Sequence, residues 1–518
     1  MAIVKKLADT AEGRQQFELL SPANMEKFAQ IECMTVDEMH AALARARTAQ
    51  KSWAALSFEQ RGEYILKALD SLMARQEELI DLVLKETPKP RNEILMMDIF
   101  TGADSMLYYA KKAKKFLSPE RIKTHGINAF GKRLELHYQP LGVIGVISPW
   151  NAPFILSLNP TVQALMAGNA VMLKPSSATM LSGSFVAEIF SDAGLPKDLL
   201  TVVTGDGRLG GALVESDVDK ISFTGGEEVG RGVGQSCAAQ FKPFSLELGG
   251  KNAVIVCEDA DLDIAAAGSV LSNYLNAGQF CGGTERVYVM DSVADEFIAK
   301  VVERVSALRQ SDSGEFDIGS LYTQEQMDSV EAQVDDAIAS GATVLCGGRR
   351  NPDLKGLYFE PTVLTDMNDE MRVISEETFG PVMSIMRVAS EQEAIEKSNA
   401  LNYGLTGIVF TRDHKKGVEI AKQLQTGNVD INFMPATYGS AEAPFGGRKA
   451  SGIGQVNGAA GLRSYCYAMP IQIDKAGGKQ LLSMYPKSLK DDENFSKFLK
   501  FLYATKIGRK IALMRSPF

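Results

Sequence analysis

Long apolar stretches are absent from this 518-residue sequence, in which no run of about 18 apolar residues occurs. The first residues, MAIVKKLADTAEGRQQ, also lack the apolar segment of a secretory signal peptide. These absences argue against a membrane-spanning helix and against secretion. A cytoplasmic location is therefore the default expectation.

Patterns for metal ions and disulfides are scarce as well. The six cysteines lie far apart, and no CxxC or HxxxH spacing occurs. The four histidines are scattered, at His40, His125, His137 and His414. We therefore expect reduced thiols rather than a disulfide framework, and no metal site.

Positive charge is in deficit: 55 Lys and Arg against 64 Asp and Glu give a formal net charge of −9. Binding along a nucleic acid needs clustered cations, so nucleic acid is not an expected partner. The hydrophobic share of 45% and the charged share of 23% are typical of a globular protein. A chain of this length is expected to form two or three domains.

Helical patterns fill the chain from Thr35 to about residue 115. Thr35 with Glu38, and Ser57 with Gln60, have the spacing of capping boxes, and a long amphipathic run follows each pair. Prolines then end the run LKALDSLMARQEELIDLVLKETPKP, because proline cannot continue a helix. At least two helices are expected here.

After about residue 126 the hydrophobic pattern changes from long helical stretches to short apolar segments. Alternation in INAFGKRLELHY (127–138) predicts a hairpin-like excursion with its turn near Gly131. Short apolar runs separated by helical stretches follow at 143–148, 170–176, 199–205 and 220–226. A second series lies at 252–259, 286–291, 342–348, 381–388 and 404–413. Continuous apolar runs at such spacing predict parallel sheets buried on both faces, so the fold class is α/β, with a domain boundary near LELGGKN.

One cysteine stands apart in LNAGQFCGGTERVYV (275–289). Cys281 lies between Gly278-Gln279 and Gly282-Gly283, so the backbone beside its sulfur carries little bulk. A thiolate that is stabilised and reachable is a strong nucleophile, which makes this position a candidate reactive centre. A small, buried and inert core residue is the alternative.

Three segments that follow strand-like runs have features of a nucleotide site. GDGRLG (205–210) matches the GxGxxG spacing, and FTGGEEVGR (223–231) leaves two glycine amides at the start of a helix, where a pyrophosphate binds well. Lys174 in LKPSSAT follows another strand, at the edge where open α/β sheets bind ligands. The alternatives are plain turns for the glycine segments and a solvent-reaching lysine for the third.

Two polar residues have positions suited to catalysis. Asn151 lies between two prolines in PWNAPF (149–154), and a rigid loop at a strand end suits an oxyanion donor, although asparagine also forms turns. Glu247 lies in the apolar stretch SLELGGKN, which should desolvate it and raise its pKa toward that of a general base. A buried carboxylate paired for structure is the alternative for Glu247.

Together these motifs resemble the NAD(P)-dependent aldehyde dehydrogenase superfamily, over residues from about Thr35 to Tyr465. The motifs are Asn151, Lys174, FTGGEEVG (223–230), ELGG (247–250), GQFC (278–281), ETFGP (377–381) and PFGGRKASGIG (444–454). The resemblance implies that Cys281 attacks the aldehyde carbon and that the Asn151 amide and the Cys281 N–H hold the oxyanion. It also implies that Glu247 activates the water that hydrolyses the thioester, with no metal.

For the cofactor, the resemblance assigns FTGGEEVG to the pyrophosphate, Lys174 to the adenine-side ribose, and Glu377 with Phe379 to the nicotinamide ribose. The expected cofactor residues are Pro149, Trp150, Lys174, Ser177, Gly207, Phe223, Gly225, Gly226, Val229, Glu377 and Phe379. Where this chain has Ser177, NAD-preferring members often carry a glutamate that repels a 2′-phosphate. We therefore expect NAD or NADP as cofactor, with NAD favoured and NADP tolerated.

The sequence departs from the family in two places. Gln455-Val456 follow SGIG where the family usually has Arg-Glu, which affects expected subunit contacts rather than the chemistry. About fifty residues follow Tyr465, and FSKFLKFLYATKIGRKIALM (495–514) has the pattern of a basic amphipathic helix. Such a helix packs across an oligomer interface, the interpretation we favour, or lies peripherally on an anionic membrane. Subunit assembly and liposome co-sedimentation after deletion of Asp491–Phe518 would distinguish the two.

The expected architecture has three parts. Residues 1–125 with 141–248 form a parallel-sheet dinucleotide-binding domain, and residues 249–442 form an α/β catalytic domain. Residues 126–140 with 443–518 form a β-ribbon oligomerisation excursion and a C-terminal extension. The resemblance implies a homodimer or homotetramer.

The expected activity is oxidation of an aldehyde to its acid with reduction of NAD(P). A medium or long aliphatic or an aromatic aldehyde is favoured, because Ala152 leaves room beside Asn151. CoA-acylating semialdehyde oxidation is one alternative, although that variant commonly lacks the base at Glu247. A thiol hydrolase or esterase is the other, but none of the four histidines lies in these motifs.

Overall fold

The structure is a computed structural model, and it describes residues 3–10, 13–125, 131–475, 477–478 and 488–506. The chain divides into a larger unit, Met1–Phe116 with Pro140–Cys466, and a smaller unit, Leu117–Gln139 with Tyr467–Phe518. No helix among the described residues combines the length and the apolar character needed to cross a bilayer.

The first helices of the larger unit begin where the capping boxes predict. Thr35 Oγ1 accepts the N–H of Glu38 at 3.2 Å, and the Glu38 carboxylate accepts the N–H of Thr35 at 2.9 Å. Ser57 and Gln60 make the same reciprocal pair, so both predicted helix starts are confirmed. The helices are α1 (Val36–Ala54), α2 (Phe58–Ala74), α3 (Gln76–Glu86), α4 (Arg91–Glu93), the π-helix η1 (Ile94–Phe100) and α5 (Thr101–Leu117).

Three strands before these helices were not predicted. They are β1 (Val4–Lys6), β2 (Gln16–Leu20) and β3 (Lys27–Glu32), and they form an antiparallel sheet in chain order. Their sequences are short and rich in Lys, Glu and Gln, so the apolar alternation on which strand prediction depends is weak there.

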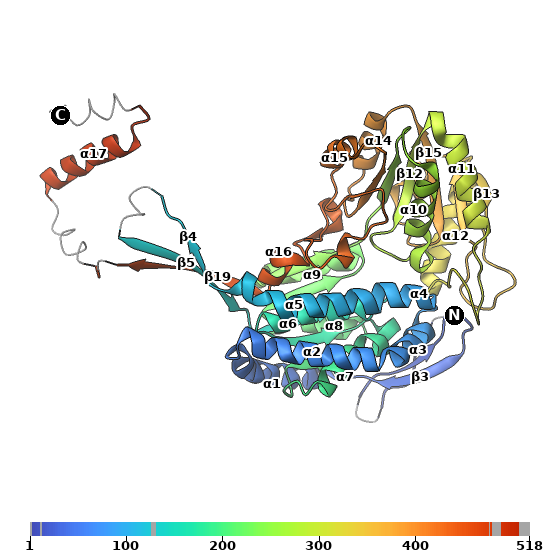
Figure 1. Cartoon of the computed structure of the whole chain (residues 1–518). Helices are drawn as coiled ribbons and strands as arrows, with labels where there is room; N and C mark the ends of the chain where they lie inside the picture. Colours follow the sequence, from blue (N-terminus) through green and yellow to red (C-terminus); the bar gives the residue numbers. More distant parts are fainter. Residues whose placement is uncertain (1–2, 11–12, 126–130, 476, 479–487, 507–518) are drawn as a thin grey trace. The chain divides into compact units, whose positions relative to one another are not determined.

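A six-stranded sheet contains the four strands predicted between residues 143 and 226 (Figure 1). Its order is β18-β10-β9-β6-β7-β8, and all pairs are parallel except that of β18 with β10. The strands are β6 (Val143–Ile147), β7 (Ala170–Lys174), β8 (Leu200–Val202), β9 (Lys220–Thr224), β10 (Phe244–Glu247) and β18 (Gly452–Ile453). The connecting helices are α6 (Ile155–Met166), η3 (Ser177–Thr179), α7 (Met180–Asp192), α8 (Gly207–Glu215) and α9 (Glu227–Ala239).

The strand order creates a switch point in this sheet. The chain enters at β6, adds β7 and β8 on one side, and then crosses to add β9 and β10 on the other side. Doubly wound sheets bind ligands at the carboxyl ends of the strands that flank such a point. Here those strands are β6 and β9, so the loops after Ile147 and after Thr224 are where a ligand is expected.

A seven-stranded sheet forms the second half of the larger unit, in the order β13-β14-β15-β12-β11-β16-β17. All its pairs are parallel except that of β13 with β14. The strands are β11 (Asn252–Val256), β12 (Thr284–Met290), β13 (Thr343–Cys346), β14 (Thr362–Thr365), β15 (Val382–Val388), β16 (Gly407–Phe410) and β17 (Asp430–Ile431). Each run of the second predicted series holds one strand, whereas β14 and β17 were not predicted. The α/β class with parallel sheets is confirmed.

Helices cover both faces of this sheet, and alternate residues of one strand enter two different cores. Val254 packs into one hydrophobic cluster and Ile255 into the other. The helices are α10 (Leu262–Tyr274), α11 (Asp291–Ser306), α12 (Gln324–Ala339), α13 (Arg372–Ser375), α14 (Glu391–Asn399) and α15 (His414–Gln423). The turn η4 (Leu275–Gly278) precedes β12, and η5 (Thr437–Gly439), η6 (Lys449–Ser451) and α16 (Gly458–Arg463) follow β17.

One short link joins the two sheets. Strand β10 ends at Glu247 and β11 begins at Asn252, so residues 248–251 pass from the carboxyl edge of the first sheet to the amino edge of the second. Cys281 lies shortly before β12, at the same amino edge. The residues predicted for catalysis and for cofactor binding therefore come from two facing sheet edges.

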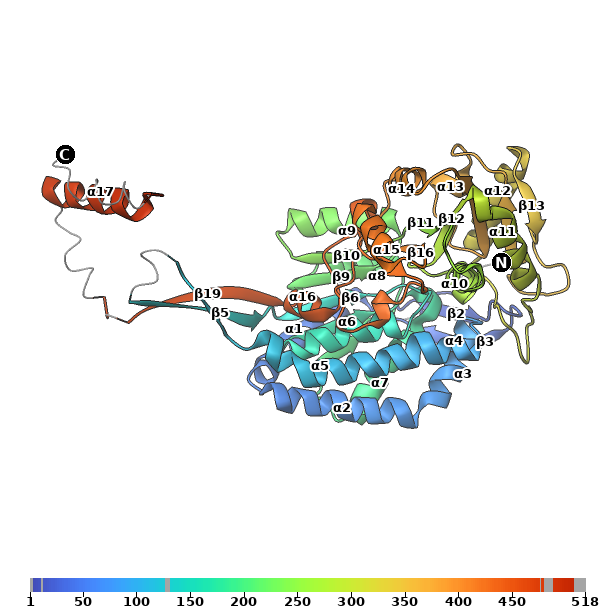
Figure 2. The same cartoon turned by 45° about the horizontal axis from the view of Figure 1, so that its top comes forward.

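The smaller unit contains a three-stranded sheet in the order β19-β5-β4 (Figure 2). Its strands are β4 (Glu120–Ile122), β5 (Lys132–Pro140) and β19 (Cys466–Asp474), and β4 pairs with β5 antiparallel. The predicted excursion is present, but its first arm lies at 120–122, upstream of the predicted range 127–138. Residues 126–130 are outside the described part of the chain.

Helix α17 (Leu489–Tyr503) replaces the helix predicted for 495–514. The predicted start was wrong because Ser488 and Asp491 form a capping box upstream of it. Residues 504–506 are not helical, and the rest of the predicted helix lies outside the described residues. Phe495 and Tyr503 are exposed on α17, and a role of this helix at a subunit interface or a membrane stays a prediction.

The expected domain limits stay a prediction. The limit after residue 248 falls on the link between the two sheets. Residues 443–466, which we expected among the oligomerisation segments, lie in the larger unit, and β18 within them extends the first sheet.

Candidate active site

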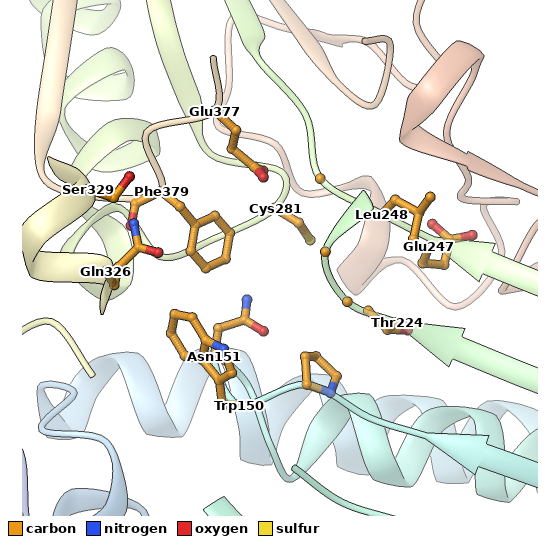
Figure 3. A pocket seen from close by; sticks show the side chains of 14 residues that line it. Trp150, Asn151, Thr224, Glu247, Leu248, Cys281, Gln326, Ser329, Glu377 and Phe379 are labelled. Atoms are coloured by element: carbon orange, nitrogen blue, oxygen red, sulfur yellow. The ribbon is translucent and has the colours of Figure 1, made fainter. Parts of the chain in front are cut away.

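A cavity of about 290 Å³ lies where the two sheet edges meet (Figure 3). It is lined by Pro149, Trp150, Asn151, Thr224, Gly225, Gly226, Glu247, Leu248, Gly249, Cys281, Gln326, Ser329, Glu377 and Phe379. The loops after β6 and β9, which flank the switch point, supply the side of the first sheet. The segments before β12 and β15 supply the side of the second sheet.

Helix α9 begins at one end of this cavity. Its N-cap is Gly226, which has no side chain to cap the first-turn N–H groups, so these donors remain available to an anion. A Cβ atom on Gly226 would meet no atom within 4 Å, which indicates open space beside the backbone. Arg231 donates to Glu227 Oε1 at 2.6 and 2.9 Å and so offsets the negative charge at this helix start. The arrangement suits a phosphate group.

The loop with Glu377 and Phe379 forms the opposite wall. Gly250 N donates to Glu377 Oε1 at 2.9 Å, and a Cβ atom on Gly249 would lie only 2.2 Å from the Glu377 carboxylate. Burial, and next the nearby charge of Glu285, raise the pKa of Glu377 to about 8. Phe379 has a left-handed backbone, with φ of 50°. Glycine at position 249 is therefore what lets Glu377 reach the cavity.

An aromatic group stands beside this loop. The Trp150 ring makes edge contacts with Phe379 and with Tyr322, at centroid distances of 5.5 and 5.2 Å. Figure 3 shows Trp150 and Phe379 together on one side of the cavity and Glu247 on the other. Aromatic side chains therefore face the Glu247 carboxyl group across the cavity.

Cys281 follows a strained turn. Asn276, Ala277 and Gly278 all have left-handed backbones, with φ of 57°, 54° and 75°. A Cβ atom on Gly278 would lie 2.0 Å from the carbonyl oxygen of Gly380, so only glycine fits there. Strain of this kind persists only where surrounding contacts enforce it, and it is common at functional sites.

The surroundings of Cys281 disfavour the ionised form of its thiol. Burial, followed by the charges of Glu247 and Glu377, raises the pKa of the thiol to about 12, although the N–H groups of Gly282 and Cys281 oppose this shift. A nucleophilic role for this sulfur would therefore need a base that takes its proton.

Asn151 reaches the same point from the first sheet. It is 4% exposed, and its Nδ2 donates one hydrogen to Gln279 O at 3.1 Å. A side-chain amide nitrogen carries two hydrogens, so the second one can be donated to a ligand oxygen near Cys281. This geometry is compatible with an oxyanion donor.

Glu247, the last residue of β10, is 7% exposed, and neither of its carboxylate oxygens has a hydrogen-bond partner among the described residues. Burial raises the pKa of Glu247 well above its usual value, which confirms the effect predicted from its apolar surroundings. A buried carboxyl group without a protein partner is costly, so such a group at a cavity wall indicates a ligand or a water molecule as its partner.

A second cavity, of about 310 Å³, meets the first at Asn151 and Cys281, which line both. Its other lining residues are Met96, Met97, Phe100, Thr101, Ala152, Ile155, Leu156, Leu275, Phe280, Phe433, Met434, Pro435, Ala436, Tyr438, Gly439 and Ser440. No lining residue in the described part of the chain carries a charged side chain at neutral pH. Cys281 and Asn151 therefore face an apolar cavity on one side and, on the other, a cavity that contains the Glu247 and Glu377 carboxyl groups.

Comparisons with known proteins agree with this geometry. A family model described as the aldehyde dehydrogenase family matches residues 9–471. The chain belongs to the aldehyde dehydrogenase family. It is similar to a putative succinate-semialdehyde dehydrogenase (NADP(+)) of Mycolicibacterium smegmatis, with 41% identity over 436 residues, 83% of either chain.

Solved structures of aldehyde dehydrogenases are also similar over nearly their whole length. A Mycobacterium tuberculosis aldehyde dehydrogenase complexed with NAD+ has a TM-score of 0.84 and 34% identity, covering 89% of this chain and 94% of that one. Betaine aldehyde dehydrogenase of Staphylococcus aureus has a TM-score of 0.86 and 31% identity, covering 94% and 100%. These similarities agree with membership of the aldehyde dehydrogenase family.

The structure of this aldehyde dehydrogenase brings many of the predicted site residues to one cavity. They are Cys281, Glu247, Asn151, Pro149, Trp150, Gly225, Gly226, Glu377 and Phe379. Thr224, from the FTGGEEVG motif assigned to the pyrophosphate, also lines it, as do Leu248 and Gly249 of the ELGG motif, which were given no role; sequence reasoning missed Gln326 and Ser329. Gln326 and Ser329 come from α12, and no motif in the sequence marks that helix.

The remaining predicted cofactor residues of the aldehyde dehydrogenase lie outside both cavity walls. Lys174 ends β7 and is buried, its Nζ donates to Pro175 O at 3.0 Å, and burial lowers the pKa of its amine to about 8. Ser177 and Gly207 follow β7 and β8 at the same sheet edge. Phe223 is buried and Val229 is exposed. Their roles stay predictions.

Proposed function

We propose that this aldehyde dehydrogenase oxidises apolar aldehydes to carboxylic acids through a thioester on Cys281. The observation that carries the proposal is that two cavities meet at Cys281: an apolar one, and one lined by the Glu247 and Glu377 carboxyl groups and by Gly226 at the start of α9. An aldehyde entering the apolar cavity presents its carbonyl carbon to Cys281, while the other cavity holds the electron acceptor.

The first step is attack of the Cys281 sulfur on the aldehyde carbon. The S–C bond forms, the carbonyl electrons move to oxygen, and the thiol proton leaves. We assign this proton to the ionised form of Glu247, whose carboxyl group lines the same cavity and has no protein partner among the described residues. The Asn151 side-chain amide, which a hydrogen bond to Gln279 O already holds in place, and the Cys281 N–H would stabilise the new oxyanion.

The groups that line the first cavity suit the successive parts of a dinucleotide. The uncapped start of α9 suits the pyrophosphate, the Glu377 carboxyl group suits ribose hydroxyls, and the Trp150 and Phe379 rings provide apolar surface. A nicotinamide held by these residues would supply the acceptor for the hydrogen and the electron pair of the former aldehyde C–H bond. The carbonyl then re-forms as a thioester on Cys281.

Hydrolysis of the thioester needs an activated water. Glu247, once ionised, would take a proton from water as its oxygen attacks the thioester carbon. The C–S bond breaks, the sulfur regains a proton, and the acid leaves. The unpartnered carboxylate oxygens of Glu247 support this role, because a structural carboxylate in a buried site would be expected to have protein donors.

The substrate class follows from the second cavity. Methionine, phenylalanine, leucine and isoleucine side chains dominate its wall, and Ala152 lies beside Asn151. A carboxylate-bearing aldehyde, of the kind named for the Mycolicibacterium smegmatis relative, needs a cation to offset desolvation of its charge. No lysine, arginine or histidine lines the cavity in the described part of the chain. We therefore propose medium or long aliphatic and aromatic aldehydes as substrates.

An aldehyde panel tests this proposal. We expect kcat/KM to rise from acetaldehyde toward decanal, with benzaldehyde also oxidised, and succinate semialdehyde to be at least about 100-fold poorer than an uncharged aldehyde of similar length. An unpaired buried carboxylate costs more than the ~2.7 kcal/mol that this ratio represents. NAD(P)H absorbance at 340 nm and acid formation without CoA are the measurements. A preference for succinate semialdehyde would contradict the substrate class.

We also propose that both NAD and NADP are used, with NAD favoured. Ser177 lies half-buried after β7, where a carboxylate would repel a 2′-phosphate. We expect Ser177→Glu to lower kcat/KM for NADP+ at least about fivefold, since one like-charge contact near 4 Å costs at least ~1 kcal/mol. NAD+ kinetics should change little, and Ser177→Ala should leave both cofactors usable. Complete rejection of NADP+ by the unaltered enzyme would refute this proposal.

A further inference from the structure

A buried carboxyl group from a distant helix supports the turn that carries Cys281. Glu93 ends α4, directly before the π-helix η1, and is 7% exposed. Its Oε2 accepts the backbone N–H of Asn276 at 2.9 Å, across a sequence separation of 183 residues. Burial raises the pKa of Glu93 to about 8. Near neutral pH this group is therefore mainly a neutral hydrogen-bond acceptor.

Asn276 is the first left-handed residue of the turn and connects it to the Asn151 loop. Its Nδ2 donates to Asn151 O and to Gln279 O, both at 2.9 Å, and its Oδ1 accepts the Tyr322 hydroxyl. The Asn151 side chain in turn donates to Gln279 O. Asn276 thus contacts both the loop that carries Asn151 and the turn that precedes Cys281.

The segment that carries Glu93 is itself fixed. Lys89 and Asp98 form an ion pair at 3.0 Å, with both side chains fully buried, and Asp98 Oδ1 accepts the N–H of Ile155 at the start of α6. Between them, η1 contributes Met96 and Met97 to the apolar cavity. π-Helical turns are rare and are often found at functional sites. The wall of the substrate cavity and the nucleophile turn therefore share one rigid support.

We propose that Glu93 is a positioning residue for the reaction: by accepting the Asn276 N–H, its carboxyl group sets the position of Cys281 relative to the Asn151 amide. This inference rests on the proposed function, because it assumes that Cys281 and Asn151 react with the aldehyde. Glu93 lines neither cavity, so it acts through Asn276 rather than on the substrate.

Substitution of Glu93 tests the proposal with a matched control. Glu93→Met keeps most of the side-chain volume but removes the acceptor, whereas Glu93→Gln keeps an acceptor oxygen. The control is Glu86→Met, because Glu86 is also a buried carboxyl that accepts backbone N–H groups, those of Leu181 and Ser182, both at 2.8 Å. Burial raises the pKa of Glu86 to about 7, so the two groups are electrostatically similar.

We expect Glu93→Met to lower kcat about 10- to 100-fold at saturating cofactor, because a displacement of about 1 Å in a catalytic group has effects of this size. The KM for NAD+ should stay near that of the unaltered enzyme. Amide hydrogen exchange of residues 275–281, followed by mass spectrometry, should become at least about tenfold faster. Glu93→Gln and Glu86→Met should match the unaltered enzyme in both measurements.

Three outcomes would overturn the proposal: unchanged exchange and kcat in Glu93→Met, an equal loss in Glu93→Gln, or an equal loss in Glu86→Met. If Glu93→Met does not fold, Glu93→Asp provides the same test, because the shorter side chain withdraws the acceptor. Failure here differs from failure of the proposed function, which would show as an active Cys281→Ser enzyme whatever the Glu93 variants do.

Discussion

Replacing the Cys281 sulfur by oxygen should abolish aldehyde oxidation. We expect Cys281→Ser to reduce kcat by at least about 10³-fold, since losses of this order or greater follow removal of a covalent nucleophile in well-studied hydrolases. A serine hydroxyl is a far weaker acid than a thiol and is harder to activate in the same buried site. NAD(P)H formation at 340 nm with decanal is the measurement, and cofactor binding, followed by ligand fluorescence, should be retained.

Cys346→Ser is the matched control for this variant. Cys346 is half-buried, as Cys281 is, but it lies in β13 and lines neither cavity. Its substitution should leave kcat within about twofold of the unaltered enzyme. An active Cys281→Ser enzyme would remove the thioester mechanism, whereas an inactive Cys346→Ser enzyme would show that general destabilisation explains the loss.

Removing the carboxyl group of Glu247 should produce the second large effect. We expect Glu247→Gln to lower steady-state turnover about 10²- to 10⁴-fold, the range that general-base catalysis contributes. If the base acts mainly on water, hydroxylamine should restore NAD(P)H formation and yield a hydroxamate, because this amine attacks a thioester without a general base. Product analysis by mass spectrometry distinguishes the acid from the hydroxamate.

The control for Glu247→Gln is Glu258→Gln, an exposed carboxyl group just after β11, which should leave turnover unchanged. Failure of hydroxylamine to restore any turnover would contradict a role limited to water activation. It would instead place the main role of Glu247 in removing the proton from Cys281. In the proposed mechanism, the raised pKa of the Cys281 thiol makes a proton acceptor necessary in the first step, and Glu247 can serve as one when it is ionised.

Much of the chemistry was predictable because it depends on residues near one another in sequence. The glycines beside Cys281, the prolines around Asn151 and the apolar neighbours of Glu247 are local features. Strands such as β6 and β12 are continuous apolar runs, which identify buried parallel sheets. The pKa of the Cys281 thiol, by contrast, depends on burial and on two carboxyl groups distant in the sequence, which the local pattern does not reveal.

What could not be predicted depends on contacts between distant segments. Gln326 reaches the cavity because its Nε2 donates to Thr378 O and Phe379 O, and nothing in α12 marks that contact in advance. The bond from Asn276 to Glu93 joins a backbone group to a side chain, so it leaves no pattern in either sequence segment. Strand β10 spans only Phe244–Glu247, which is too short for its alternation to be recognised.

Among the described residues, Asn151 and Cys281 alone belong to the walls of both cavities. If each cavity holds one molecule, as proposed, the other lining residues form two nearly independent sets of positions for redesign. Substitution of Met96 or Phe433 should change the selectivity for aldehyde chain length without altering nucleotide affinity. Substitutions near Gly225 should change nucleotide affinity without altering chain-length selectivity. The two cavities can therefore be redesigned separately, except at the Asn151 amide and the Cys281 thiol, which both cavities share.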